Sequence, residues 1–232
     1  MDLSIVDPVF FAMLTLYYSP LSPNARRVWV LLLEKQVEFE LKPLSLKGDQ
    51  RHPGFQSLNP FGQIPVLVDG SRTIVESLAI LDYLEACYPQ PCFLPSDPGV
   101  LARVRMVEQL TDNKLLYTLG SLITDRPGSE PYDRALGLVH KTLGFWENLL
   151  GHDPYFGGDT LSLGDIVAGT TFPLFQALGL GLETYSQLHH WMERLNDRPS
   201  WQTTALSVDG WREFKRRISV LVMMQKRRNQ GS

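Results

Sequence analysis

The hydrophobic and polar positions of the first ninety residues predict strands and helices in alternation. Residues 14–18 (LTLYY) form a short apolar run typical of a strand, and residues 37–44 (VEFELKPL) alternate as a half-buried strand does. Between them, residues 25–36 (ARRVWVLLLEKQ) repeat apolar positions at helical spacing, with charges gathered toward one side. The polar residues 47–63, which include Gly and Pro, are expected to hold a short irregular helix between loops.

Two further patterns complete this half of the chain. Residues 64–75 (IPVLVDGSRTIV) are two short β-branched runs joined at Asp69-Gly70, which is a hairpin signal. Residues 76–89 (ESLAILDYLEACYP) gather their leucines on one helical face, and Pro89 ends the helix. The order β-α-β-α-β-β-α, a parallel crossover followed by a hairpin, predicts a small α/β layer domain.

A proline-rich link divides the chain in two. Four prolines occur within residues 89–98, so we place a linker at 90–99 between an α/β domain at 13–89 and a second domain at 100–232. Helical patterns dominate from residue 101 onward and no strand-like alternation is convincing, which predicts an all-helical C-terminal domain. Its tail, residues 211–232, places ISVLVMM between basic clusters and is expected to be an amphipathic helix packing on its own domain.

Composition and charge exclude several classes of protein. The formal net charge is −3, which gives no reason to expect nucleic acid or an anionic membrane as partner. No apolar run approaches the ~20 residues of a membrane span, and residues 1–12 lack a basic n-region, so we interpret them as a short N-terminal extension. The two cysteines, Cys87 and Cys92, are expected to be reduced thiols in a cytoplasmic protein, and the scattered histidines predict no metal site.

The stretch YYSPLSPNARRV, residues 17–28, holds the first candidate for chemistry. Ser22 followed by Pro23 favours a helix start, because the hydroxyl accepts from an orphan N–H and proline has none to satisfy. Taken alone, this pattern is more typical of a helix cap than of a catalytic residue. A thiol-redox enzyme would need Cys-x-x-Cys here, so any thiol involved must arrive with a ligand.

Two other short stretches are candidates for ligand binding. In NPFGQIPVL, residues 59–67, a cis Ile64-Pro65 bond would leave the Ile64 backbone as an edge for an extended peptide, although an ordinary turn is the common case. In VES, residues 75–77, a helix N-terminus at Ser77 suits a carboxylate and Glu76 suits an ammonium. Together they fit the zwitterionic end of an α-amino acid; the alternative is a helix cap with a first-turn acid.

In their order and spacing, these segments resemble the cytosolic glutathione transferases over nearly the whole chain, from about Met13 to about Trp211. YYSPLSPNARRV, EKQVEFELKPLSL, NPFGQIPVLVDG and ESLAILDYLEACYP are similar to that family's thioredoxin-like domain. SLGDIVAG, residues 162–169, resembles the capping box of its helical domain, which Ser162 and Asp165 would form. The resemblance implies a detoxifying transferase with glutathione as cosubstrate, a two-domain subunit and usually a homodimer.

The resemblance also implies roles for particular residues. The block around Ser22 is most similar to the serine-type classes, phi and theta, in which the serine after the first strand hydrogen-bonds the glutathione sulfur; Asn24 and Arg27 sit in its flank. The phi-like NPFGQIP implies that Gln63, Ile64 and Pro65 hold the cysteinyl part. Glu76 and Ser77 would hold the γ-glutamyl end.

The pattern departs from the family in three places. Gln50 and Arg51 lie where phi enzymes place a His-Lys pair for the glycine carboxylate, so one cation is kept and one possible donor is lost. No cysteine follows LYYSP, which disfavours the cysteine-type mechanism, while Ser19, Tyr17 and Tyr18 stay as alternates for Ser22. Residues 1–12 have no counterpart.

The mechanism expected from this resemblance is thiolate stabilisation. A hydroxyl at a helix N-terminus favours the anion of a thiol, and the thiolate is the nucleophile. Hydrophobic electrophiles would bind in an apolar cleft between the domains, and Asp112 is expected to reach the γ-glutamyl ammonium of its own or the other subunit. The expected walls of that cleft are Tyr17, Leu21, Leu115 and Leu119.

Three alternatives remain open from the sequence. The same fold can serve glutathione-dependent isomerisation, dehalogenation or peroxide reduction, or it can serve as a non-catalytic interaction module. A third class, binding of a membrane or nucleic acid through the basic tail, is the one that composition favours least.

Overall fold

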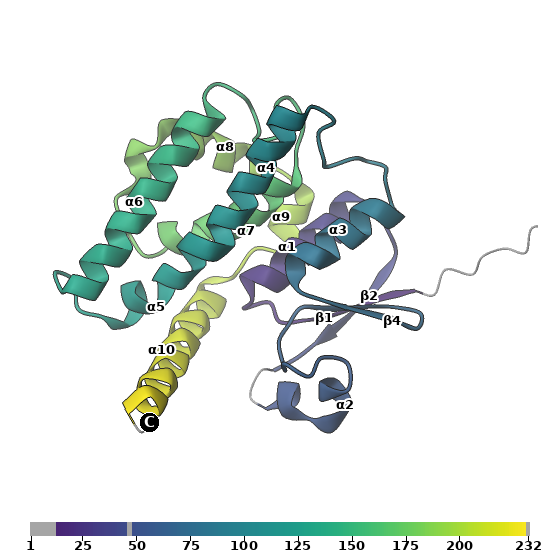
Figure 1. Ribbon diagram of the computed structural model, residues 1–232, viewed down its shortest axis with the longest axis horizontal. Coiled ribbons are helices and arrows are strands. Elements are labelled where there is room, and N and C mark those ends of the chain that lie inside the picture. The colour runs from purple at the N-terminus through teal and green to yellow at the C-terminus, as the bar shows by residue number, and fades with distance from the viewer. Residues whose placement is uncertain (1–12, 46–47, 231–232) are drawn as a thin grey trace, which may run out of the picture.

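The computed structural model describes residues 13–45 and 48–230 of the chain (Figure 1). Its N-terminal half is a four-stranded sheet in the order β2-β1-β3-β4, in which β1 and β2 are parallel and the other pairs antiparallel. The strands are β1 (Leu14–Tyr18), β2 (Phe39–Pro43), β3 (Val66–Asp69) and β4 (Arg72–Val75). The predicted β-α-β-α-β-β-α order is confirmed, and the half has a thioredoxin-like fold; residues 1–12, the expected extension, lie outside the described part.

Helices cover both faces of this sheet (Figure 1). Helices α1 (Pro23–Glu34) and α3 (Ser77–Cys87) lie on one face, while the short helices η1 (Asp49–Arg51) and α2 (Pro53–Gln56) lie on the other. The alternation of β1 explains this layering, because Leu14 and Leu16 are buried in the core and Tyr18 packs edge-on against Trp29 of α1. The predicted strand at 37–44 is shorter in the structure, since Gln36 (φ 54°) ends the helix region and Val37 still donates to a carbonyl of α1.

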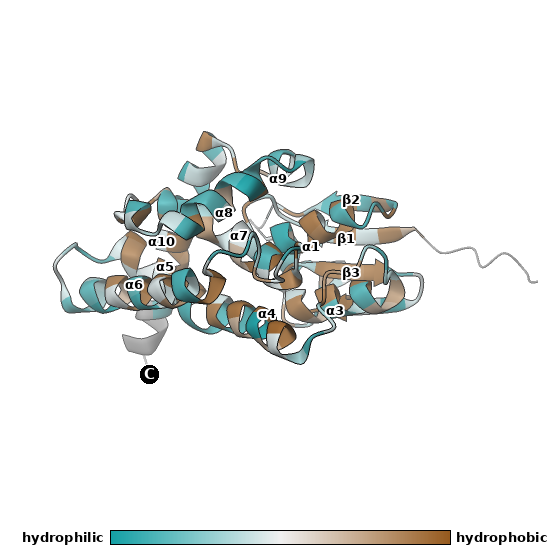
Figure 2. Ribbon diagram, turned by 90° about the horizontal axis from the view of Figure 1, so that it is seen from above, coloured by the Kyte–Doolittle hydropathy of each residue, from teal (hydrophilic) through white to brown (hydrophobic). Residues whose placement is uncertain are grey.

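The second half is all-helical within the described residues, as the sequence predicts, apart from one isolated bridge between Tyr155 and Gly158. Its elements are α4 (Pro98–Leu110), a π-helical turn η2 (Thr111–Leu115), α5 (Leu116–Thr124), α6 (Glu130–Leu150), α7 (Leu163–Gln176), η3 (Leu182–Thr184), α8 (Ser186–Asn196), α9 (Pro199–Thr203) and α10 (Val208–Gln230). Figure 2 shows β1 and β3 coloured mainly hydrophobic and the outer helix α8 mainly hydrophilic, which matches their burial. No helix in the described part is both long and apolar enough to cross a membrane.

The capping box at the start of α7 is confirmed and is buried. The Ser162 hydroxyl donates to Asp165 Oδ2 at 2.6 Å, and the Ser162 N–H donates to the same oxygen at 2.9 Å. The other oxygen, Oδ1, accepts from the Phe156 N–H and from Trp191 Nε1, each at 2.8 Å. Burial raises the pKa of Asp165, and these hydrogen bonds oppose that rise. One carboxylate therefore joins the loop before α7 to α8.

The two halves are joined by partly buried polar contacts along α1. Glu34 at its C-terminal end accepts from Arg198 Nη2 at 2.6 Å, and Arg26 Nε donates to Thr204 Oγ1 at 3.2 Å. Lys35 binds Glu85 at 2.8 Å and donates to the carbonyls of Tyr88 and Pro91, within the link between α3 and α4. The domain junction is thus a fixed interface.

The tail helix α10 begins earlier than expected and is only partly covered. Ser207 starts it, because its hydroxyl accepts from the Gly210 N–H at 3.0 Å. Phe214 is buried and stacks on Trp211. Further along, α10 packs against α5, and Val222 lies close to Gly120 of α5. The expectation that the tail packs on its own domain is met on this side. Four of its apolar side chains are more than half exposed, namely Val208, Leu221, Met223 and Met224.

Candidate functional site

Four chain segments converge at the carboxyl end of β1. The strand register pairs Tyr17 with Val66 and Val66 with Val75, which places the loop before β3 and the start of α3 beside the end of β1. On the other side of β1, the Leu44 N–H donates to the Tyr18 carbonyl at 2.8 Å and brings in the end of β2. Nearly all polar residues singled out in the sequence therefore lie around one edge of the sheet.

Ser22 is the N-cap of α1 and is accessible. Its Oγ accepts from the Ala25 N–H at 3.2 Å, and Pro23 occupies the first helical position. Ser22 is half-buried, whereas Ser19 is only 3% exposed and its Oγ lies 3.4 Å from the Leu21 N–H. Of the two serines, Ser22 is the one whose hydroxyl an external ligand can reach.

The two tyrosines of β1 point to opposite faces of the sheet. Tyr18 packs against Trp29 with 5.1 Å between ring centroids, beneath α1. Tyr17 lies on the other face, 5.9 Å from the ring of Phe55 and with the Lys42 ammonium 5.7 Å from its own ring. Alternation along a strand accounts for this split, so the alternates Tyr17 and Tyr18 cannot serve the same position.

The loop that precedes β3 is shaped by a buried asparagine. Asn59 Nδ2 donates to the Gln63 carbonyl at 2.8 Å, and Asn59 Oδ1 accepts from the Phe61 N–H at 3.0 Å. Gly62 has a φ of +62°, and a Cβ there would lie 3.0 Å from the Gln50 carbonyl oxygen, so the loop packs directly on η1. Gln63 is exposed, Ile64 is half-buried ahead of the strand, and the Ile64-Pro65 peptide bond is cis.

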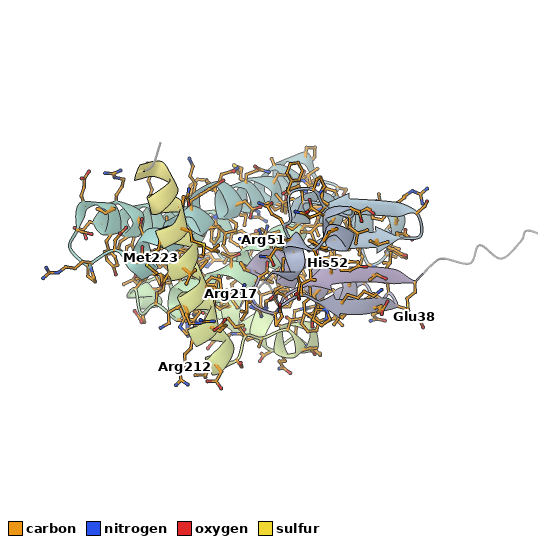
Figure 3. The ribbon with its side chains drawn as sticks, turned by 90° about the horizontal axis from the view of Figure 1, so that it is seen from below. Glu38, Arg51, His52, Arg212, Arg217 and Met223 are labelled. Atoms are coloured by element: carbon orange, nitrogen blue, oxygen red, sulfur yellow. The ribbon has the colours of Figure 1, made fainter. Side chains whose placement is uncertain are left out.

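Helix η1 presents Gln50 and Arg51 at the rim of this edge. Asp49 begins the helix, and its Oδ2 accepts from the Ser45 N–H at 2.8 Å, which lowers the pKa of Asp49. Arg51 and the following His52 are exposed on the surface seen from below (Figure 3). Gln50 and Gln63 are therefore neighbours through Gly62, and Arg51 offers a cation beside them.

At the start of α3, no side chain of the described residues caps the first N–H groups. Glu76 precedes it with φ 66° and ψ 116°, a conformation that is uncommon for a residue with a side chain, and Glu76 is exposed. Ser77, the first helical residue, is 6% exposed. Helix α3 has eleven residues, and the free N–H groups at its N-terminus are suited to binding an anion.

Arg27 is a functional candidate whose role the sequence does not predict. Its side chain is fully buried on α1, with Nη1 at 2.7 Å from Asp112 Oδ1 and 3.4 Å from Ser77 Oγ. Nε and Nη2 have no hydrogen-bond partner among the described residues. Burial lowers the pKa of Arg27, and the charges of Asp112 and Glu108 oppose that shift. The sequence signal for the burial of Arg27 is its position four residues before Leu31, which puts it on the apolar face of α1.

The helical half supplies Asp112, whereas two residues of the expected apolar wall, Leu115 and Leu119, are enclosed. Asp112 lies in the π-helical turn η2, with a side chain 26% exposed, and its Oδ2 has no hydrogen-bond partner among the described residues. Leu115 is fully buried and Leu119 is 4% exposed, so both belong to the core. Of the other expected wall residues, Tyr17 and Leu21 are half-buried at the edge of the sheet.

A hollow elsewhere in the molecule does not involve these residues. It has a volume of about 170 Å³ and lies in the helical half, between α7 and the start of α8. Its lining residues are Phe172, Gln176, Leu180, Leu182, Glu183 and His189. Within the described ranges, no group of three or more His, Cys, Asp or Glu side chains is placed to hold a metal ion.

Comparisons with known proteins agree with this arrangement. Family models described as glutathione S-transferase N-terminal domain and C-terminal domain match residues 16–92 and 129–194. Glutathione S-transferase 3 of Zea mays is 30% identical over 212 residues, covering 85% of this chain and 95% of that protein. Maleylacetoacetate isomerase of Pseudomonas aeruginosa is 29% identical over 181 residues, covering 72% and 84% respectively. A solved glutathione S-transferase-I bound with lactoylglutathione aligns with a TM-score of 0.71 and 26% identity, over 84% of this chain and 99% of that one.

Proposed function

The chain belongs to the glutathione S-transferase family, and we propose that it conjugates the thiolate of glutathione to hydrophobic electrophiles, with Ser22 stabilising that thiolate. The observation that carries the proposal is the meeting of three anion-binding features at one edge of the sheet. They are the accessible Ser22 hydroxyl at the start of α1, the uncapped N-terminus of α3 and the buried guanidinium of Arg27. A tripeptide with a thiol and two carboxylates is the ligand that suits them.

In this proposal the γ-glutamyl end of glutathione binds at the start of α3. Its carboxylate would accept from the first N–H groups and the Ser77 hydroxyl, above the positive charge of Arg27. Glu76 is exposed and would pair with the ammonium. Asp112 holds Arg27 through one oxygen, and its other oxygen can accept from the same ammonium, in its own subunit or across a dimer.

The remaining parts of glutathione follow along the edge of the sheet. The backbone of Ile64, ahead of β3, would pair with the cysteinyl amide, with Gln63 and Pro65 beside it. The glycine carboxylate would then lie at Gln50 and Arg51, which the packing of Gly62 holds next to this loop. This order carries the thiol to the start of α1, where Ser22 lies.

Capping and thiolate stabilisation do not compete at Ser22. The hydroxyl oxygen accepts from the Ala25 N–H, so the hydroxyl hydrogen is available to donate to the sulfur. An unperturbed thiol has a pKa of ~8.5 and is only a small fraction thiolate at neutral pH. A hydrogen bond and the helix dipole together lower that pKa by about one to two units, on the order of 1.4–2.7 kcal/mol. No metal and no general base is required for this step.

We also propose a serine-type, phi- or theta-like class, a homodimer and a cytoplasmic location. Support for the dimer comes from large apolar side chains that are exposed on the surface of the subunit. Phe61 is 73% exposed and Tyr117 is 79% exposed, and Met106 on α4 is 41% exposed. The class rests on the position of Ser22 and on NPFGQIP, and the location on the pair of free cysteines.

The test is the pKa of the bound thiol. Titrating the thiolate of enzyme-bound glutathione by ultraviolet absorbance is expected to give a higher pKa in Ser22→Ala than in the wild type, by the part of the shift that the hydrogen bond contributes, because the dipole of α1 remains. Ser19→Ala is the matched control, because Ser19 is enclosed and its substitution should leave the pKa unchanged. An unchanged pKa in Ser22→Ala, with glutathione still bound, would refute the role of Ser22.

Isomerisation is the second candidate function. It is favoured by the likeness to maleylacetoacetate isomerase, which covers 72% of this chain. The thiolate site would be the same, but the electrophile would leave as an isomer with glutathione regenerated. A panel of aryl halides, unsaturated keto acids, haloalkanes and peroxides separates conjugation, isomerisation, dehalogenation and peroxide reduction, and inactivity on all of them would favour a non-catalytic interaction module.

A further inference from the structure

A hydrogen bond on the surface joins the tail helix to the glutathione side of the molecule. Arg217 projects from α10, and its Nη1 donates to the Ser45 carbonyl at 2.8 Å. Helix α10 is itself fixed to the helical half through Phe214, which is 4% exposed, and through the packing of Val222 on Gly120. The Arg217 side chain therefore extends from one domain to a backbone carbonyl of the other.

Ser45 is linked directly to the helix that carries the proposed glycine site. Its N–H donates to Asp49 Oδ2 at 2.8 Å, and Asp49 is the first residue of η1, followed by Gln50 and Arg51. The far side of η1 is fixed as well, because Gly62 packs on the Gln50 carbonyl. Arg217 thus completes the support of η1 from the side that faces α10.

We infer that Arg217 is a positioning residue for the glycine carboxylate of glutathione, acting through Ser45 and Asp49 on Gln50 and Arg51. The inference rests on the proposed function, because it assumes that Gln50 and Arg51 receive that carboxylate. In Figure 3, Arg217 lies on the same face of the molecule as Arg51 and His52. A second guanidinium on this face adds positive potential where a carboxylate approaches. The tail helix is in this way coupled to the binding of glutathione.

A purely structural role for the same bond is distinguishable. The domain junction is already held by the contacts of Glu34 with Arg198 and of Arg26 with Thr204. The bond from Arg217 is exposed to solvent, where such bonds add little to global stability. Substitution of Arg217 should therefore leave the melting temperature nearly unchanged and weaken only the binding of the glycine end of glutathione.

The experiment compares two ligands that differ only in the glycine. The dissociation constants of glutathione and of γ-glutamylcysteine are measured by isothermal titration calorimetry for the wild type and Arg217→Ala. Glutathione is expected to bind about three- to tenfold more weakly to the variant, as for loss of one charged hydrogen bond, and γ-glutamylcysteine is expected to bind unchanged. Arg217→Lys, which keeps a donor, is expected to recover part of the loss. Arg212→Ala is the matched control, because Arg212 pairs with Asp209 within α10.

The outcomes separate this inference from the function it rests on. Arg51→Ala serves as the benchmark for the glycine site. If Arg51→Ala weakens glutathione selectively and Arg217→Ala does not, the positioning role is refuted and the glycine site stands. If neither variant distinguishes the two ligands, the glycine site at Gln50 and Arg51 is refuted, and the positioning role with it. Equal weakening of both ligands by Arg217→Ala also overturns the inference.

Discussion

The buried pair of Arg27 and Asp112 should respond very differently to removal of one partner or the other. Arg27 is 0% exposed, and Asp112 is 26% exposed. Asp112→Ala leaves a buried cation uncompensated, which costs ~3–5 kcal/mol for a fully buried pair and, with the partial exposure of Asp112, about 2–3 kcal/mol here. Arg27→Met removes the cation together with the two nitrogens that have no hydrogen-bond partner in the described part of the chain, and it leaves a carboxylate that water can reach, so it should cost about 1 kcal/mol.

Thermal melts by circular dichroism test this asymmetry. At roughly 2–4 °C per kcal/mol for a chain of this size, Asp112→Ala should melt about 4–12 °C lower and Arg27→Met only a few degrees lower. The double variant should resemble Arg27→Met, because neither charge of this pair remains. Asp209→Ala is the control, since its pair with Arg212 is exposed on both sides. Equal losses, or a larger loss in Arg27→Met, would refute the account of Arg27 as a buried cation compensated by Asp112.

Two other predictions concern the shape of the site and its pH dependence. Gly62→Ala places a side chain on a residue with positive φ beside the Gln50 carbonyl, so it should lower the melting temperature and weaken the binding of glutathione. Gly137→Ala is the control, because Gly137 lies in an open position of α6, where alanine should raise the melting temperature. Burial raises the pKa of Glu108, and the ion pair with Arg105 opposes that rise. Because the pKa of Glu108 is higher in the folded than in the unfolded state, its contribution to stability is fully present below the unfolded-state pKa and is lost as the pH rises through the folded-state pKa. Glu108→Gln should therefore raise the melting temperature more at pH 8 than at pH 4, and an equal gain at both would contradict this reasoning.

The fold of the α/β half follows from local signals in the sequence. The apolar run 14–18, the Asp69-Gly70 turn and the alternation after residue 37 each identify an element, and the right-handed crossover leaves few ways to arrange them. The boundaries are less well predicted, because they depend on contacts beyond the pattern. Val37 belongs to the end of the α1 region rather than to β2, since its N–H donates to Leu32.

The candidate site is predictable only where the chain itself brings its residues together. Ser22, Gln63 and Glu76 each lie next to a strand end, and paired strands carry those ends to one edge of the sheet. Arg27 is different, because its role comes from Asp112, 85 residues away in the other domain. A long-range partner of this kind leaves no trace in the local pattern around either residue.

The expected electrophile wall shows the limit of helical periodicity most clearly. Leu115 and Leu119 are one turn apart and share a face, which the spacing predicts correctly, but that face is turned into the core. Tyr117 lies between them in sequence, on the opposite side of the helix, and is 79% exposed. Periodicity identifies which residues lie together, and only the packing of α5 against α6 and α10 decides which face is buried. In the proposed function, the choice of electrophile would therefore depend on the arrangement of the helical half, whereas the proposed glutathione site depends on the sheet.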